Sequence, residues 1–244
     1  GLNADLERLA SGEPVQYVMG YADFCGLRFK VTPDVLIPRP ETELLCREAI
    51  KIGSRMQRMR KAYGKSARPV RILDLCTGSG CIAWTVALNI PGAEVIGVDI
   101  SEGAVAVAAG QDFISKPKET EVVAPRFVVA DILAEPQSFA EGDFDLILSN
   151  PPYIIESQKA QMRANVLNFE PSTALFVKDE DPLVFYRSIA KLSSELLVPE
   201  GKGMAEINEL LGPETAKVFW DAGFPKTEVI KDFYDKNRFV FYSK

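Results

Sequence analysis

The strongest local pattern in the chain is the segment Phe144-Asp145-Leu146-Ile147-Leu148-Ser149-Asn150-Pro151-Pro152-Tyr153. Residues 144–148 are apolar apart from Asp145 and predict a short buried strand. Each proline holds the residue before it in an extended conformation and has no N–H to donate, so the strand ends with carbonyl groups that face outward. The segment therefore predicts a rigid rim at the carboxyl end of a strand, which is the edge of an open α/β sheet where ligands bind.

This rim offers acceptors for a planar –NH2 group. The side-chain oxygen of Asn150 and the carbonyl of Pro151 can each accept one N–H, and Tyr153 can pack against the flat group. One face of the nitrogen then stays open to an electrophile. A second interpretation stays open on this motif alone, in which the prolines only end a strand and Tyr153 is a surface aromatic residue.

Composition and charge exclude several classes of protein. The 244 residues are 47% hydrophobic and 25% charged, as is usual for a globular protein with a substantial core. The chain has no histidine, which removes Ser-His-Asp and Cys-His nucleophile systems and most zinc sites, so we expect no metal. A net charge of −6 disfavours a protein that mainly grips nucleic acid phosphates, and we expect no stable nucleic acid partner.

The sequence also bears on the compartment. No apolar run approaches ~20 residues and no charged-then-apolar leader opens the chain, so we expect neither a membrane span nor a signal peptide. The four cysteines form no C-x-x-C pair, which favours a reducing environment. We therefore expect a cytoplasmic protein.

One basic cluster follows a predicted helix, and it comprises Arg55, Arg58, Arg60, Lys61, Lys65 and Arg68. We expect these side chains to be solvated and to complement the negative C-terminal end of the helix dipole. A contact with RNA or with an acidic partner is the alternative.

The order of predicted elements indicates the fold class. A hairpin is expected from residues 21–24 and 27–31, and a helix from Pro40 or Glu41 to about Arg58. From Pro69 onward strands alternate with helices, which predicts a parallel sheet. The expected strands are 71–75, 94–99, 126–130, 145–149, 203–207, 227–231 and 239–242, the last two as an antiparallel pair; the expected helices are 81–89, 103–115, 182–197 and 212–222. We also expect a turn at residues 199–203 and a functional long connection at residues 157–181.

A glycine-rich loop, Asp74-Leu75-Cys76-Thr77-Gly78-Ser79-Gly80, follows the first strand of this series and opens a helix. Its glycines allow a tight turn and a close approach of a ligand to the backbone. Asp99 ends the next strand, where a carboxylate can hold both ribose hydroxyls, and Asp131 follows the third strand, where it suits an adenine amino group.

Three interpretations of this loop compete. With Ala83 the loop fits the dinucleotide pattern G-x-G-x-x-A, so an NAD enzyme must be considered. An acid at Asp74 instead suits a ligand with an amino group and a sulfonium, and Asn-Pro-Pro-Tyr has no role in hydride transfer. A tight turn that binds nothing is the third interpretation. The series of acids at successive strand ends favours S-adenosylmethionine as the cofactor.

Taken together, the motifs resemble those of the release factor glutamine N5-methyltransferases of the HemK/PrmC type, from nearly one end of the chain to the other. The resemblance rests on Gly12-Glu13-Pro14-Val15-Gln16-Tyr17-Val18-Met19-Gly20, the Phe24 to Phe29 hairpin, Ile37-Pro38-Arg39-Pro40-Glu41-Thr42-Glu43, the 74–80 loop, Asn150-Pro151-Pro152-Tyr153 and Phe169-Glu170-Pro171. Asn-Pro-Pro-Tyr alone is shared with adenine-N6 methyltransferases, whereas its combination with Pro-Arg-Pro-Glu-Thr is much more specific.

The resemblance implies a class I S-adenosylmethionine-dependent methyltransferase fold, α/β, with a seven-stranded mostly parallel sheet, an antiparallel last strand and a preceding β-hairpin. Residues 36–244 would form the catalytic domain, and residues 1–35 the end of an interdomain helix and the hairpin. We expect most of the family's N-terminal helical domain to be missing, apart from a last turn within Leu2–Ala10. Cys76 departs from the family, because glycine is common at its position.

The resemblance also assigns the site. The catalytic residues would be Asn150, Pro151 and Tyr153. The cofactor would be held by Asp74, Cys76, Thr77, Gly78, Ser79, Gly80, Asp99, Ile100, Asp131, Ile132 and Asn150. The glutamine of a release factor's Gly-Gly-Gln loop would be held by Arg39, Glu41, Asn150, Pro151, Pro152, Tyr153 and Glu170.

For Arg39 and Glu41 a second interpretation stays open, namely a local ion pair and a charge at a helix start. We expect a monomer that transfers a methyl group directly to a carboxamide nitrogen. The rivals are an adenine-N6 methyltransferase acting on DNA or RNA and a cofactor-binding scaffold without activity.

Overall fold

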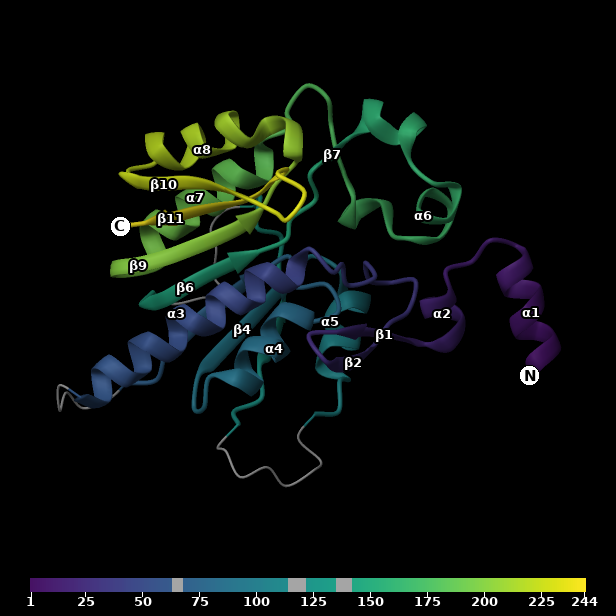
Figure 1. The fold of residues 1–244 in the computed structure, drawn as a ribbon, viewed down its shortest axis with the longest axis horizontal. Coiled ribbons are helices and arrows are strands. Elements are labelled where there is room, and N and C mark those ends of the chain that lie inside the picture. The colour runs from purple at the N-terminus through teal and green to yellow at the C-terminus, as the bar shows by residue number, and fades with distance from the viewer. Residues whose placement is uncertain (63–67, 114–121, 135–141) are drawn as a thin grey trace.

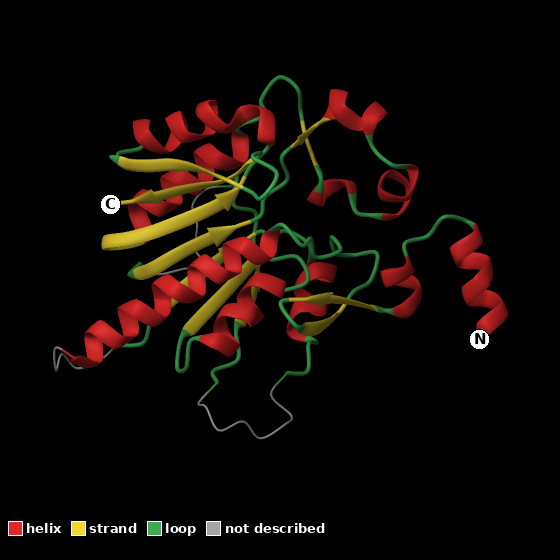
Figure 2. Ribbon diagram, in the orientation of Figure 1, coloured by secondary structure: helices red, strands yellow, loops and turns green. Residues whose placement is uncertain are grey.

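The computed structural model describes residues 1–62, 68–113, 122–134 and 142–244, and it shows a central sheet between two layers of helices (Figure 1 and Figure 2). The helices are α1 (Leu2–Ala10), α2 (Val15–Met19), α3 (Thr42–Ala62), α4 (Cys81–Asn89), α5 (Glu102–Ala109), η1 (Glu156–Gln161), α6 (Ala164–Phe169), η2 (Ser172–Ala174), α7 (Val184–Leu196), η3 (Glu209–Leu211) and α8 (Gly212–Asp221). The strands are β1 (Tyr21–Phe24), β2 (Leu27–Lys30), β3 (Arg71–Leu75), β4 (Glu94–Asp99), β5 (Arg126–Val129), β6 (Phe144–Ser149), β7 (Ile154–Ile155), β8 (Phe176–Val177), β9 (Leu197–Glu206), β10 (Lys226–Lys231) and β11 (Asn237–Ser243).

The large sheet has seven strands in the order β10-β11-β9-β6-β3-β4-β5. Strand β11 is antiparallel to both neighbours, and the other pairs are parallel. The predicted fold class is confirmed. From β3 the chain adds β4 and β5 on one side and later places β6 on the other, so the carboxyl ends of β3 and β6 meet where the strand order reverses.

Alternate side chains of the strands enter two cores, one on each face of the sheet. In β3, Ile72 packs with Leu45 of α3 and Ile82 of α4, whereas Leu73 packs on the opposite face with Ile189 of α7. Every residue of β6 is buried. A strand covered on both faces reads as a continuous apolar run, which explains why this strand was predictable from its sequence.

The predicted hairpin is present as β1–β2, and it packs against the same body. Phe24 and Phe29 join the core that contains α3 and α4. Beyond α5, the side chain of Gln111 accepts a hydrogen bond from the Lys30 N–H (2.9 Å) and donates one to the Lys30 carbonyl (3.0 Å), much as a neighbouring strand would. The boundary expected between residues 35 and 36 stays a prediction.

Two helices differ from their predicted bounds. Helix α3 begins at Thr42 and continues to Ala62, past the expected end near Arg58. Helix α5 ends at Ala109, earlier than predicted, because the chain turns at Gly110 and Gln111 then bonds to the hairpin. Positions 114 and 115 of that predicted helix lie outside the described residues.

Two connections contain more regular structure than expected. Residues 157–181 hold most of η1 and all of α6, η2 and β8, and β8 pairs in parallel with β7 just beyond Tyr153. The turn expected at residues 199–203 lies within β9 as an irregularity of the strand: the register with β6 jumps from Phe144↔Leu197 to Leu146↔Lys202, and Glu200 has a φ of +66°. Among the described residues no helix is long and apolar enough to cross a membrane.

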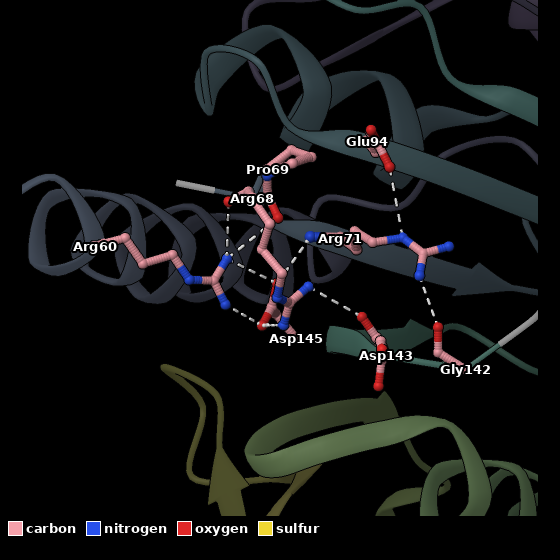
Figure 3. Close-up of polar contacts among 8 residues, drawn as sticks. All are labelled: Arg60, Arg68, Pro69, Arg71, Glu94, Gly142, Asp143 and Asp145. Carbon is pink, nitrogen blue, oxygen red and sulfur yellow. Dashed lines mark hydrogen bonds and ion pairs between the residues drawn. The ribbon is translucent and has the colours of Figure 1, made fainter. Parts of the chain in front are cut away.

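The prediction for the basic cluster missed an ion pair with Asp145 that two of its arginines form, as Figure 3 shows: Arg60 is partly buried, whereas Arg68 is exposed as expected but also pairs. Arg60 and Arg68 both bind the carboxylate of Asp145, whose side chain is only 1% exposed at the start of β6, and the Arg71 N–H donates to the same carboxylate at 2.9 Å. Arg55, Arg58 and Lys61 are exposed, as expected. Lys65 lies outside the described residues.

Candidate active site

The glycine loop and the Asn-Pro-Pro-Tyr segment meet at one edge of the sheet. Leu75 and Ser149 are register partners at the ends of β3 and β6, and the Ser149 hydroxyl donates to the Leu75 carbonyl at 2.8 Å. A cavity of about 320 Å³ opens at this edge. Its lining includes eleven predicted site residues: Arg39, Cys76, Thr77, Gly78, Ser79, Asp99, Ile100, Asp131, Ile132, Asn150 and Pro152.

The other predicted site residues lie next to this lining rather than in it, and they are Glu41, Asp74, Gly80, Pro151, Tyr153 and Glu170. The lining also contains residues that were not among the predicted site residues, including Val35, Thr42, Thr173, Phe176 and Phe185. The apolar members of this group carry no local pattern that separates a cavity wall from a core.

The backbone of the glycine loop is held in conformations that favour glycine. Gly78 and Gly80 have φ of +53° and +77°, and Cys76 has φ of +61°. This explains why a glycine suits the position of Cys76, since a side chain there strains the backbone by an amount on the order of 1–3 kcal/mol. A Cβ at Gly78 would meet no atom within 4 Å, so the loop leaves open space for a ligand beside its backbone.

Asp74 lies beneath the loop. Its Oδ2 accepts hydrogen bonds from the Thr77 hydroxyl (2.6 Å) and the Ala83 N–H (3.2 Å), and its Oδ1 has no partner among the described residues. Burial raises the pKa of this carboxyl to about 7. Asp74 therefore ties the loop to the start of α4, and its predicted contact with the cofactor stays a prediction.

Asp99 faces the cavity at the end of β4. Its Oδ2 accepts from the Gly78 N–H (2.8 Å), and its Oδ1 accepts from the Ser101 N–H (3.0 Å). Each carboxylate oxygen can accept a further bond, so the pair can still receive two hydroxyl donors. Burial raises the pKa of the carboxyl, although these backbone N–H groups act in the opposite direction.

Asp131 follows β5 on the same side. Its Oδ1 accepts from the Leu133 N–H at 2.8 Å, which fixes the turn after the strand. Ile100 and Ile132, each next in the chain to one of these carboxylates, contribute apolar surface to the same cavity. An acceptor next to apolar walls suits a flat base that carries an amino group.

Asn150 is held in one orientation by a chain of hydrogen bonds. Its Nδ2 donates to Thr42 Oγ1 at 3.2 Å, and the Thr42 hydroxyl donates to Glu206 Oε2 at 2.7 Å. The Tyr153 hydroxyl donates to Glu206 Oε1 at 2.9 Å. The amide oxygen of Asn150 is thus the atom not engaged by Thr42, and it can accept an N–H at the cavity.

Tyr153 is anchored by its hydroxyl. Burial and the neighbouring Glu206 carboxylate raise the pKa of the phenol well above its usual range, so the group stays protonated. The Asn208 side chain also donates to the Tyr153 carbonyl at 3.0 Å. These bonds hold the Asn-Pro-Pro-Tyr segment rigid where it leaves β6.

Glu206 and Thr42 were not predicted as site residues, although one signal pointed to Glu206. It is a lone acid in the apolar strand segment 203–207 and ends β9, at the same edge as the acids at the carboxyl ends of β3, β4 and β5. Thr42 lies in the Pro-Arg-Pro-Glu-Thr segment that carries the resemblance, but its role depends on contacts with residues 108 and 164 positions away, which no local pattern shows.

The Pro-Arg-Pro-Glu segment forms one wall of the cavity. Arg39 lines it and pairs with Glu170, whose Oε1 lies 2.7 Å from Arg39 Nη2. The side chain of Glu170 is 1% exposed, and its Oε2 accepts from the Ile37 N–H at 3.1 Å. The structure therefore places Glu170 as an anchor of this wall, and Arg39 pairs with it rather than with Glu41.

These features fit S-adenosylmethionine. The cavity combines a loop with backbone N–H groups, a carboxylate at the end of β4, a second carboxylate after β5 and apolar walls. This combination suits a ligand in which an amino acid is joined to a nucleoside. The fold and the site together define a class I methyltransferase that uses S-adenosylmethionine. In agreement, the family model described as "Methyltransferase domain" matches residues 67–211.

The chain belongs to the release factor glutamine methyltransferase family. It is 42% identical over 233 residues to the release factor glutamine methyltransferase of Bacteroides thetaiotaomicron, covering 96% of this chain and 77% of the relative. It is 37% identical over 235 residues to that of Flavobacterium psychrophilum, with the same two coverages.

Solved structures agree with this placement. The release factor-specific protein-(glutamine-N5) methyltransferase of Alicyclobacillus acidocaldarius matches with a TM-score of 0.50 and 27% identity, covering 88% of this chain and 99% of that one. A methyltransferase from Pyrococcus furiosus matches with a TM-score of 0.60 over 99% of this chain and 98% of its own, but at 14% identity it supports the fold alone.

Proposed function

We propose that this protein transfers the methyl group of S-adenosylmethionine to the side-chain amide nitrogen of a glutamine in peptide chain release factors, within their Gly-Gly-Gln motif. The observation that carries the proposal is the orientation of Asn150, whose Nδ2 is bound to Thr42 so that its oxygen can accept an N–H at the cavity. A carboxamide nitrogen has two N–H groups, and the carbonyl of Pro151 can accept the second.

The residues at the cavity suggest how the cofactor is held. The carboxylate of Asp99 would accept from the ribose hydroxyls, and Asp131 would accept from the adenine amino group. The loop from Cys76 to Gly80 would hold the amino acid part with its backbone. When bound, S-adenosylmethionine supplies an electrophilic methyl group.

The chain's own contribution to the reaction is orientation and charge stabilisation. Asn150 and Pro151 would hold the glutamine nitrogen in line with the methyl group, and orientation of this kind contributes up to about 7–11 kcal/mol to lowering a barrier. Their oxygens would also face the positive charge that grows on the nitrogen as its bond to the methyl carbon forms and the bond between that carbon and the sulfonium sulfur breaks, with S-adenosylhomocysteine as the leaving group. The nitrogen then loses one of its protons to water, which leaves the N-methyl amide.

The remaining parts of the proposal concern partners and place. Release factors are the proposed protein substrate, and Arg39 lies in the wall that a substrate loop would pass. The net charge of −6 supports the absence of a stable nucleic acid partner. We propose a monomer in the cytoplasm, where translation takes place.

One experiment tests the substrate class. The purified protein is incubated with S-adenosylmethionine labelled in its methyl group and with two substrates, a release factor and duplex DNA. Mass spectrometry should place one methyl group on the glutamine of the Gly-Gly-Gln motif, and the Asn150→Ala variant serves as the control for protein-dependent labelling. Label on adenine in DNA, with none on the release factor, would replace the proposal by an adenine-N6 methyltransferase.

A further inference from the structure

The side-chain amide of Asn150 can adopt two orientations that exchange its oxygen and its –NH2 group and have almost the same shape. In one its oxygen faces the substrate, and in the other its –NH2 group does. Only the first can accept an N–H from the substrate, because an –NH2 group is a donor alone. The neighbours of Asn150 must therefore select one of two nearly isosteric states.

The hydroxyl of Thr42 cannot make this selection by itself. A hydroxyl both donates and accepts, so it could bond to either end of the Asn150 amide. The selection comes from Glu206. Burial raises the pKa of this carboxyl, whereas the hydroxyls of Thr42 and Tyr153, one on each oxygen, and the charge of Arg238 act in the opposite direction. With both oxygens receiving a hydroxyl proton, the carboxylate accepts only. Thr42 has one proton and uses it on Glu206 Oε2 at 2.7 Å, which leaves lone pairs toward Asn150 Nδ2 at 3.2 Å.

Glu206 is well placed for this task and does not touch the cavity. It is 1% exposed and lies at the last position of β9, behind the wall that Thr42 and Asn150 form. Its second oxygen accepts from the Tyr153 hydroxyl at 2.9 Å, so one carboxylate holds both ends of the Asn150–Tyr153 segment. With a hydroxyl proton on each oxygen, the carboxylate offers no donor to Thr42.

We propose that Glu206 is a positioning residue. It acts through the Thr42 hydroxyl and fixes the orientation of the Asn150 amide in which the oxygen faces the substrate. The inference rests on the proposed function for its effect on turnover, but the hydrogen-bond relay itself can be observed without turnover. In this inference Glu206 and Thr42 both orient the acceptor oxygen of Asn150. Glu206 itself does not touch the reacting atoms.

The test uses a matched pair of variants at Thr42. Thr42→Val keeps the shape and removes the hydroxyl, whereas Thr42→Ser keeps the hydroxyl. Because the effect is indirect, we expect Thr42→Val to lower kcat by about 10- to 100-fold, somewhat less than the ~10²–10³ typical for the loss of a directly acting group, and Thr42→Ser to recover most of the loss. The Kd for S-adenosylmethionine should change little in either variant.

Glu206→Gln tests the selection itself. A carboxamide at this position has a donor end as well as an acceptor end, so Glu206→Gln removes the partner that can only accept. With the –NH2 end toward Thr42, the Thr42 proton is free to bond to the oxygen of Asn150, and the Asn150 amide is no longer held in one orientation. We expect a loss of kcat comparable to that of Thr42→Val, with a melting temperature close to that of the wild type. If this variant does not fold, the Thr42 pair carries the test.

A spectroscopic readout separates this inference from the proposed function. With ¹⁵N-labelled asparagine, the Asn150 –NH2 signal (assigned by its loss in Asn150→Ala) should move in Thr42→Val and Glu206→Gln and stay in place in Thr42→Ser. If the wild type methylates no release factor, the proposed function fails, and the NMR comparison still decides the relay. If Thr42→Val matches Thr42→Ser in both kcat and NMR signal, the inference is wrong.

Discussion

Arg39 and Glu170 lie 131 residues apart in the chain, and an ion pair of 2.7 Å joins them beside the cavity. The same carboxylate accepts from the Ile37 N–H, so Glu170 ties the segment before α3 to the connection after Asn-Pro-Pro-Tyr. Two walls of the cavity, contributed by distant parts of the sequence, are thereby fixed to one another.

Replacing Glu170 should loosen these walls. Glu170→Ala leaves the Ile37 N–H and the Arg39 guanidinium without this partner, and we expect the free energy of unfolding to fall by about 1–3 kcal/mol, the cost of an unsatisfied buried polar group. Urea denaturation measures the change. Glu170→Gln is the matched control, since it keeps an acceptor and should lose less; equal stability of Glu170→Ala and wild type would contradict the anchoring role.

Asp99 should determine cofactor affinity. One hydrogen bond to a charged group contributes about 1.5–3 kcal/mol, so Asp99→Ala should weaken S-adenosylmethionine binding by at least about tenfold in calorimetry. Asp99→Asn keeps the shape of the side chain and an acceptor, and controls for collapse of the glycine loop, whose Gly78 N–H bonds to Asp99. An unchanged Kd in Asp99→Ala would contradict the proposal that Asp99 binds the ribose hydroxyls of the cofactor.

Asn150 should matter more for turnover than for cofactor binding. Removing one preorganised group typically lowers turnover by about 10²–10³, and we expect this loss in Asn150→Ala on a release factor substrate. The Kd for S-adenosylmethionine should change much less. Turnover within about fivefold of the wild type would mean that the segment serves only to end β6.

Asp74 should make the stability of the ligand-free protein depend on pH. Its pKa is raised by burial to about 7 in the folded protein, compared with about 3.9 in an unfolded chain. The folded state therefore holds the proton more tightly, so this contribution to stability is present in full below about pH 4 and is lost as the pH rises to about 7.

The measurement compares wild type with Asp74→Asn, which cannot ionise at this position. Between about pH 5 and about pH 8, urea denaturation should show that wild type loses stability relative to the variant. The pKa of the nearby Asp99 is also raised, and its charge is one cause of the raised pKa of Asp74, so the difference reports the titration of Asp74 together with this coupling. A difference that does not change with pH would show that the Asp74 carboxyl is ionised throughout.

The parts of the fold that were predictable depend on local patterns. The bounds of β3, α4 and β4 agree with the structure because apolar strands flank a glycine loop that fixes the start of the helix. The same patterns brought most of the predicted cofactor residues to one cavity. Strand ends at a common edge of a parallel sheet converge without any need to know distant contacts.

The parts that were missed depend on contacts between distant residues. No local pattern shows that Arg60 turns back to Asp145, 85 positions later, so the arginine looked like a solvated helix end. The early end of α5 follows from the bonds of Gln111 to the hairpin, 81 positions earlier. Thr42 and Glu206 likewise serve the site through each other and through Asn150.

Helix α3 and strand β6 are fastened together at both ends. Thr42 bonds to Asn150 at the cavity, and Arg60 binds Asp145 at the opposite edge of the sheet. The helix is about 27 Å long between Thr42 and Arg60. The extended chain is about 17 Å long between Asp145 and Asn150. Because α3 and β6 are linked at both ends, the helix cannot slide along the strand without breaking either the Thr42–Asn150 hydrogen bond or the Arg60–Asp145 ion pair. The buried carboxylate far from the chemistry thus helps to keep the Thr42 hydroxyl in register with the amide that it holds.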